Sequence, residues 1–144
     1  MEPEYYSAVF PIEDLKAHVR PEDLRAFKNI GLDRINGGSH LAQLRQGPRT
    51  VGLSSLQIYP QYEEVHVTYI EICSDVRGDK LGRKLLASIF DYAADMAKQS
   101  TEHIFISAGG FTAKGERSIL PAMKELSIEY SSRGVTFDPP EHYR

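Results

Sequence analysis

Residues 76–86, VRGDKLGRKLL, place two glycines among four basic side chains in a protein that is acidic overall. These residues are Gly78, Gly82, Arg77, Lys80, Arg83 and Lys84. A strand-like run precedes the segment and a helical pattern follows it. A tight turn at such a junction points backbone N–H groups at one place, where the helix dipole adds about half a positive charge. The residue types predict either a phosphate-binding turn or an ordinary solvated helix N-terminus, and spacing alone leaves both open.

Other kinds of site chemistry receive little support from the sequence. Residues 76–86 lack the GxxxxGK[ST] pattern of a Walker loop, and the tripeptide Arg-Gly-Asp at residues 77–79 carries little information about adhesion. Cys73 is the only cysteine, so neither an intrachain disulfide nor a multi-cysteine metal site is expected. The five histidines have no spacing typical of metal ligands, and no metal site is predicted.

The composition is that of one globular domain, which we predict to span residues 1–144. Lys and Arg number 17 and Asp and Glu number 20, and the net charge of −3 argues against nucleic acid as a partner. No apolar run approaches the roughly 18 residues that a membrane span needs, and the N-terminal segment lacks the features of a secretion signal. We therefore expect a soluble, cytoplasmic protein without a membrane partner, and a homodimer stays open.

Hydrophobic periodicity and turn residues predict the order β, α, α, β, β, β, α, β, α, β. The predicted strands are residues 5–10, 40–45, 50–60, 63–74, 103–108 and 135–137. The predicted helices are residues 12–19, 21–27, 81–97 and 116–130, with Pro21 in a first helical turn. Residues 36–39 are predicted to form a loop, and residues 46–48 a turn between the two strands of a hairpin.

The strand at residues 63–74 is expected in the middle of the sheet, because it becomes apolar on both faces. The helix at 81–97 connects it to the strand at 103–108, and such a crossover requires a parallel, right-handed connection. The preceding hairpin requires antiparallel pairing. The predicted fold class is therefore α/β (α+β), with a mixed but predominantly antiparallel central sheet flanked by helices.

The stretch YIEICSDVRGDKLGRKLL resembles the acyl-CoA signature of the GNAT acyltransferase superfamily, [QR]-x-x-G-x-[GA], which lies between the fourth strand and the following helix of that fold. Arg77 matches the first position and Gly82 the last, whereas Lys80 occupies the place of the central glycine. The predicted order of elements is similar to that fold over nearly the whole chain. The resemblance implies a single GNAT-like domain with acetyl-CoA as acyl donor.

In that family the turn after the fourth strand holds the CoA pyrophosphate, and the end of the strand hydrogen-bonds the pantetheine. The resemblance thus implies a cofactor site formed by Ile72, Cys73, Arg77, Gly78, Asp79, Lys80, Leu81, Gly82 and Arg83. A bulge in the fourth strand would separate it from the fifth and leave a slot for the thioester. The lysine in place of the motif glycine either adds a phosphate contact or narrows the entrance.

Catalysis in such enzymes is direct transfer, in which a general base deprotonates the amine. We predict Glu71 as the base, because it lies two residues before Cys73, beside the expected bulge, and a carboxylate is costly to bury in an apolar strand. A Glu71 that faces solvent or pairs with a lysine is the simpler interpretation. Glu64, His66 and Tyr69 are the alternative bases.

The family's usual general acid is a tyrosine in the helix after the fifth strand. Met123 stands where that tyrosine is expected, and Glu116 stands near the position of the family's asparagine. Tyr130 and Ser118 are alternatives in the same segment, and no acid is assigned.

These inferences predict an N-acetyltransferase that moves an acetyl group from acetyl-CoA to a primary amine of a small molecule or a protein. Acidic residues in the N-terminal helices and at residues 63–64 favour a cationic acceptor. The alternative is a catalytically silent GNAT-like module that binds CoA or a protein partner. Three departures from the family pattern favour this alternative: Lys80, Met123 and the absence of the family's asparagine.

Overall fold

The computed structural model describes residues 4–76, 80–109, 111 and 113–143. Its strands are β1 (Tyr6–Pro11), β2 (His40–Gln46), β3 (Arg49–Tyr59), β4 (Glu64–Ile72), β5 (Ile104–Ala108) and β6 (Val135–Asp138). Its helices are α1 (Leu15–His18), α2 (Pro21–Leu24), α3 (Gly31–Gly37), α4 (Leu81–Ser100) and α5 (Ala113–Tyr130). Most predicted elements are confirmed with ends moved by a few residues. None of the helices in this described part is long and apolar enough to cross a membrane.

The strands form one sheet in chain order from β1 to β6, so β4 lies in its interior as predicted. The first four strands pair antiparallel, whereas β4 with β5 and β5 with β6 pair parallel. The sheet is therefore mixed, and the prediction of a predominantly antiparallel sheet was wrong. The reason is a second crossover: α5 returns the chain for β6 just as α4 returns it for β5, and each crossover makes a parallel pair.

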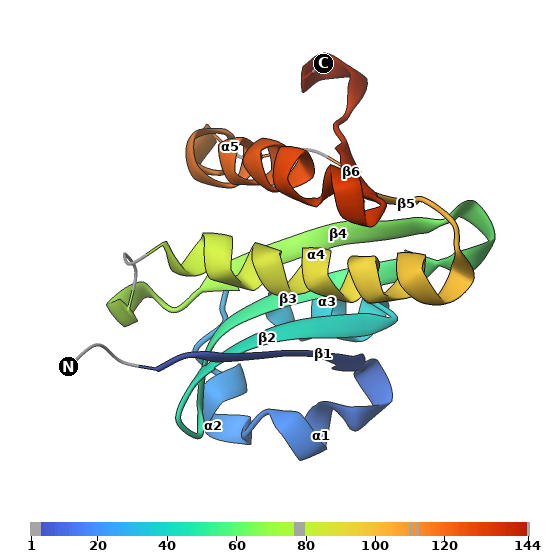
Figure 1. Ribbon diagram of the computed structural model, residues 1–144. Coiled ribbons are helices and arrows are strands. Elements are labelled where there is room, and N and C mark those ends of the chain that lie inside the picture. The colour runs from blue at the N-terminus through green and yellow to red at the C-terminus, as the bar shows by residue number, and fades with distance from the viewer. Residues whose placement is uncertain (1–3, 77–79, 110, 112, 144) are drawn as a thin grey trace.

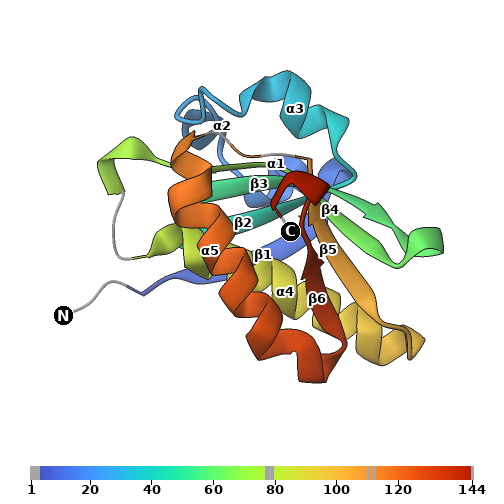
Figure 2. The ribbon, with the colours of Figure 1, turned by 90° about the horizontal axis from the view of Figure 1, so that it is seen from above.

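Helices cover both faces of the sheet (Figure 1, Figure 2). Helices α4 and α5 lie on one face, where the larger core is built around fully buried residues of α4 such as Leu85, Ile89 and Phe90. Helices α1, α2 and α3 lie on the other face over a smaller core that includes Phe10 and Leu53. The apolar residues of α4 recur every three or four positions, which is why its buried stripe was predictable.

Helix α3 was not predicted, and the loop expected at residues 36–39 was placed partly on it. Glycines at both ends give this segment a low helix propensity. Tertiary contacts hold it instead, because Ile30 and Ile35 are buried in the smaller core. In addition, the Glu71 carboxylate of β4 accepts hydrogen bonds from the main-chain N–H groups of Asn29 and Ile30 just before the helix. Packing and a long-range polar contact thus override local propensity.

Candidate active-site cleft

Strands β4 and β5 separate part-way along their length. Their pairing ends at Val67 and Ala108, and β4 continues to Ile72 without a further β5 partner among the described residues. The part of β4 between Thr68 and Glu71 has no β5 register partner among the described residues, and such a strand edge can accept an extended ligand like another strand. The predicted opening between the two strands is therefore present.

A β-bulge lies at the point of separation. Ser55 of β3 is opposite Tyr69, and the next β3 residue, Leu56, is opposite Val67, so Thr68 of β4 is the extra residue. A bulge bends its strand and increases its local twist. This geometry turns the end of β4 away from β5, as the sequence-based prediction required.

A cleft of about 1380 Å³ opens at the separation. Its walls are the end of β4, the first turn of α4 and the N-terminal half of α5, and it also includes Asn29 and Arg34 from the α3 side. Because α3 and α4 lie on opposite faces of the sheet, the cleft connects the two faces through the opening between β4 and β5. Two ligands could thus meet there from opposite sides.

The first turn of α4 forms one end of the cleft. Its leading N–H groups have no acceptor in a preceding helical turn. Gly82 lines the cleft, and a Cβ atom on it would lie 3.2 Å from Ile119 Cδ1 of α5, so this position is narrow. The exposed side chain of Lys80 and that of Lys114 add positive charge to the same wall. Anionic groups are therefore favoured at this end.

Lys80 immediately precedes α4 and has a left-handed backbone, with φ 57° and ψ 38°. This region is the one that glycine adopts without strain. The family pattern has a glycine at this position. Lys80 thus adopts the left-handed backbone conformation that suits a glycine.

Arg83 is held by acidic residues of α5. Its Nη1 atom lies 2.7 Å from Glu125 Oε2 and its Nη2 atom lies 3.4 Å from Glu129 Oε2. These ion pairs partly neutralise a cation that the sequence assigned to the cofactor site. The structure thus gives Arg83 a second use, which is to tie α4 to α5.

The remaining predicted cofactor residues fall into three groups. Ile72 and the buried Leu81 line the cleft. Cys73 is not among the lining residues: its N–H donates to Val51 O at 2.9 Å, its side chain packs in the smaller core, and burial raises the pKa of its thiol. Arg77, Gly78 and Asp79 lie outside the described residues.

Glu71, the predicted base, lines the cleft from β4. Its Oε1 atom accepts hydrogen bonds from the N–H groups of Asn29 at 3.1 Å and Ile30 at 2.8 Å, and its Oε2 atom lies 3.5 Å from Asn29 Nδ2. The carboxylate is thus positioned at the opening but is already engaged by the turn before α3. Its catalytic role stays a prediction.

The alternative bases lie on the same face of the sheet as Glu71. Tyr69 stacks under Arg34 of α3, whose guanidinium carbon is 4.0 Å from the ring centroid. Glu64 and His66 converge on Ser107 of β5, which sequence reasoning did not single out. Ser107 reaches Glu64 and His66 through the pairing of β4 with β5. The contact could not be predicted from the position of Ser107 in the sequence.

The candidates for a general acid are divided by the structure. Met123 and Ser118 both line the cleft. Met123 is buried, whereas Ser118 is exposed and its hydroxyl donates a hydrogen bond to Lys114 O. Tyr130 lies elsewhere, because its hydroxyl donates to Asp91 Oδ1 at 2.5 Å between α5 and α4. Burial and this hydrogen bond raise the pKa of Tyr130 to about 12.

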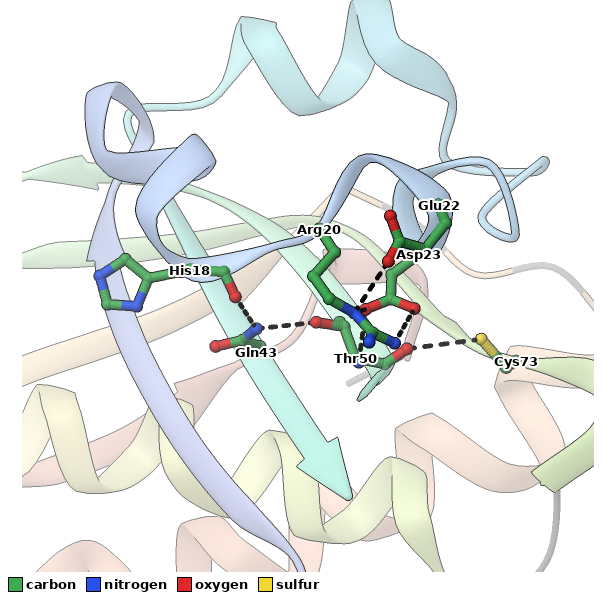
Figure 3. A network of polar contacts seen from close by, with 7 residues as sticks. All are labelled: His18, Arg20, Glu22, Asp23, Gln43, Thr50 and Cys73. Atoms are coloured by element: carbon green, nitrogen blue, oxygen red, sulfur yellow. Dashed lines mark hydrogen bonds and ion pairs between the residues drawn. The ribbon is translucent and has the colours of Figure 1, made fainter. Parts of the chain in front are cut away.

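A separate polar network attaches α1 and α2 to the sheet (Figure 3). Asp23 of α2 is paired with Arg20 Nε at 3.0 Å and accepts a hydrogen bond from the Thr50 N–H at 3.1 Å. Gln43 Nε2 joins the same network by donating to Thr50 Oγ1 and to His18 O. Burial raises the pKa of Asp23, but the hydrogen bonds from Arg20 and Thr50 outweigh it, and the net pKa is lowered. Asp23 therefore has a structural use, rather than the acceptor-binding use that its charge suggested.

Comparison with known proteins gives matches at the level of structure. No protein-family model matches the sequence, and no curated protein sequence does. A putative acetyltransferase from Deinococcus radiodurans R1 matches over 82% of this chain and 80% of its own, with 10% identity and a TM-score of 0.59. An aminoglycoside N-acetyltransferase in complex with CoA matches over 94% and 90%, with 10% identity and a TM-score of 0.56.

Two further matches have lower TM-scores. A ribosomal-protein-alanine N-acetyltransferase from Brucella melitensis biovar Abortus 2308 matches over 79% of this chain and 87% of its own, with 17% identity and a TM-score of 0.51. The match to an IAA acetyltransferase from Bacillus cereus ATCC 14579 spans 61% of that chain and 65% of this one, with 16% identity and a TM-score of 0.49. The three matches with TM-scores above 0.5 show that the chain has the fold of the GNAT acyltransferases, as the signature at residues 77–82 predicted.

Proposed function

We propose that this protein is an N-acetyltransferase that transfers the acetyl group of acetyl-CoA to a primary amine. The observation that supports this most directly is the opening between β4 and β5, with a cleft that joins both faces of the sheet beside the first turn of α4. The likeness of the fold to structures of acetyltransferases, one of them an aminoglycoside N-acetyltransferase in complex with CoA, supports it independently.

The residues of the cleft fit acetyl-CoA. The leading N–H groups of α4 and the ammonium groups of Lys80 and Lys114 would hold its phosphates, and the end of β4 would hold its pantetheine. When bound, acetyl-CoA supplies an activated acyl carbonyl. Glycine at position 82 keeps the first turn of α4 free of a side chain that would crowd Ile119 of α5.

The acceptor amine would enter from the α3 face, where Asn29, Arg34 and Glu71 line the cleft. After losing one proton to a base of the protein, the amine nitrogen attacks the thioester carbon. An N–C bond forms, the C–S bond breaks, and the departing thiolate takes the second proton of the nitrogen. Glu71 remains the sequence-based candidate for the base.

Acetyl-CoA is expected to raise the melting temperature of the protein, because a ligand at 100 times its Kd adds about 2.7 kcal/mol to the free energy of unfolding.

Lys80→Glu should weaken acetyl-CoA binding by roughly 10- to 100-fold, since it replaces a charge-assisted contact with a repulsive charge. The unliganded variant should remain folded, because an acidic residue is favourable at a helix N-terminus. Isothermal titration calorimetry measures the loss.

Lys98→Glu is the matched control, because Lys98 is an exposed lysine in the last turn of the same helix, at the end away from the cleft. It should bind acetyl-CoA like the wild type. Equal losses in both variants, or no thermal shift in the wild type at millimolar acetyl-CoA, would contradict the proposed site. Binding without release of free thiol across a broad panel of amines would instead favour the non-catalytic module.

A further inference from the structure

Three residues of β4 and β5 form a chain of hydrogen bonds one residue pair before these strands separate. His66 Nδ1 lies 2.8 Å from Ser107 Oγ, and the Ser107 hydroxyl donates to Glu64 Oε2. His66 and Ser107 are register partners in the parallel pairing. Their neighbours along the strands, Val67 and Ala108, form the last β4–β5 pair and line the cleft.

The hydrogen bonds define the protonation of the imidazole. An ionised Glu64 carboxylate only accepts, so the single hydroxyl proton of Ser107 is used in the bond to it. Ser107 Oγ can then only accept from His66, which requires a proton on Nδ1. In a neutral imidazole, the proton on Nδ1 leaves Nε2 as an unprotonated nitrogen with a free lone pair.

The unprotonated nitrogen faces the exposed backbone at the end of β5. A Cβ atom built on Gly109 would lie 3.9 Å from His66 Nε2, and glycine leaves that space open. Among the described residues Nε2 has no hydrogen-bond partner. Val65 and Val67 are buried in the larger core on the α4 side of the sheet. His66 lies between them in the strand, so its side chain points to the opposite face, the face on which α3 lies (Figure 2).

We propose that His66 is the general base for the acceptor amine, with Ser107 and Glu64 as positioning residues that fix its tautomer. This inference rests on the proposed acetyltransferase function. His66 Nε2 takes one proton from the acceptor ammonium, which leaves a neutral amine for attack on the thioester carbon. The imidazolium then returns the proton to water. Its positive charge is stabilised by Glu64, whose Oε2 atom is 3.8 Å from Nδ1.

The surroundings of His66 are largely polar and carry both signs of charge. Tyr69 of β4 is on the same face, with Arg34 of α3 stacked on its ring. On the β3 side the register partner of His66 is the uncharged Gln57. On the β6 side Asp138 is opposite Ser107. Glu64 is the carboxylate that the hydrogen bonds join to the imidazole, which is why it is the group assigned to stabilise the imidazolium.

The tautomer is tested in the free protein by nitrogen-15 NMR of the histidine side chains. At alkaline pH, where the imidazole is neutral, the wild type should have a protonated Nδ1 and an unprotonated Nε2 on His66. Ser107→Ala should lose this preference and Ser107→Thr, which keeps a hydroxyl, should restore it. A wild-type imidazole protonated on Nε2 would overturn the inference. This readout needs no acceptor, so it remains decisive even if no amine is acetylated, a result that would contradict the proposed function instead.

Kinetics test the catalytic role. His66→Gln should lower kcat by roughly 100- to 1,000-fold near neutral pH and remove the ascending limb of the pH–rate profile, with acetyl-CoA binding unchanged. His103→Gln is the control, because His103 is an exposed histidine bound to Thr136 at the other end of β5, and it should keep the wild-type profile. Wild-type turnover in His66→Gln, or loss of the ascending limb in Glu71→Gln alone, would assign the base elsewhere.

Discussion

Lys80 shows how one residue can depart from a family pattern and keep its geometry. A residue with a Cβ atom is strained in the left-handed region by about 1–2 kcal/mol, whereas glycine is not. Lys80 tolerates this conformation at the first residue before α4 and in return presents a cation at the cleft. The departure that favoured a non-catalytic module is therefore compatible with a phosphate site.

Lys80→Gly should leave the free energy of unfolding unchanged or raise it by up to about 1 kcal/mol, because relief of backbone strain offsets the added entropy of the unfolded chain. Lys84→Gly, at an exposed position within the same helix, should lower it by about 1 kcal/mol. Urea unfolding of both variants measures the difference. Equal destabilisation by the two glycines would mean that the backbone before α4 is not left-handed.

Tyr130, which is buried, should ionise only at a pH well above the range usual for tyrosine. Its pKa is raised to about 12 by burial and by the hydrogen bond to Asp91. Because the folded-state pKa is above the ordinary value of about 10, the stabilisation is complete below pH 10 and is lost as the pH rises toward 12. Tyr130→Phe should cost about 1 kcal/mol at pH 8 and remove the highest step in an ultraviolet titration of phenolate. An unchanged titration would contradict the contact.

At the level of elements, α1 and α2 are too short to be stable alone and depend on their contacts with the sheet. The Asp23 carboxylate connects α2 to β3 through Arg20 and the Thr50 N–H, while Gln43 connects α1 to β2 and β3 (Figure 3). This polar attachment complements the apolar core beneath these helices. It also fixes one side of the sheet face on which the acceptor is proposed to bind.

Asp23→Asn should lower the free energy of unfolding by about 1–3 kcal/mol at pH 6, since it removes a buried, charge-assisted set of hydrogen bonds. Glu22→Gln is the control, because Glu22 contacts the same Arg20 Nε at 3.4 Å but is exposed, and it should have little effect. Guanidinium unfolding measures both.

The effect of pH follows from the lowered pKa of Asp23. A carboxyl whose folded-state pKa is depressed stabilises the protein above its unfolded pKa, which is about 3.9, and loses that contribution as the pH falls through the folded-state value. The difference between wild type and Asp23→Asn should therefore shrink below about pH 4. A difference that stays constant down to pH 2 would show that the charge of Asp23 is not involved.

At the level of the whole molecule, features with a local periodic pattern were predictable. Three features can each be recognised from residues that are close together in the sequence: the apolar stripe of α4, the interior position of β4 and the signature at residues 77–82. Contacts between distant segments were not predictable in this way. The pairing of Arg83 with Glu125 and of His66 with Ser107 depends on the crossovers made by α4 and α5. Helix α3 was missed for the same reason, because its stability comes from burial and from Glu71 rather than from propensity.

The short β4–β5 pairing also has a consequence for how the chain assembles. Strands β2, β3 and β4 are consecutive and connected by short turns, so they can pair while the rest of the chain is still being synthesised. Residues 64–67 meet residues 105–108 only after all of α4 has emerged and docked, and such long-range contacts form late. Until then the edge of β4 is open to pairing with other chains. The same edge of β4 that would hold a ligand in the folded protein is thus exposed to aggregation until β5 pairs with it.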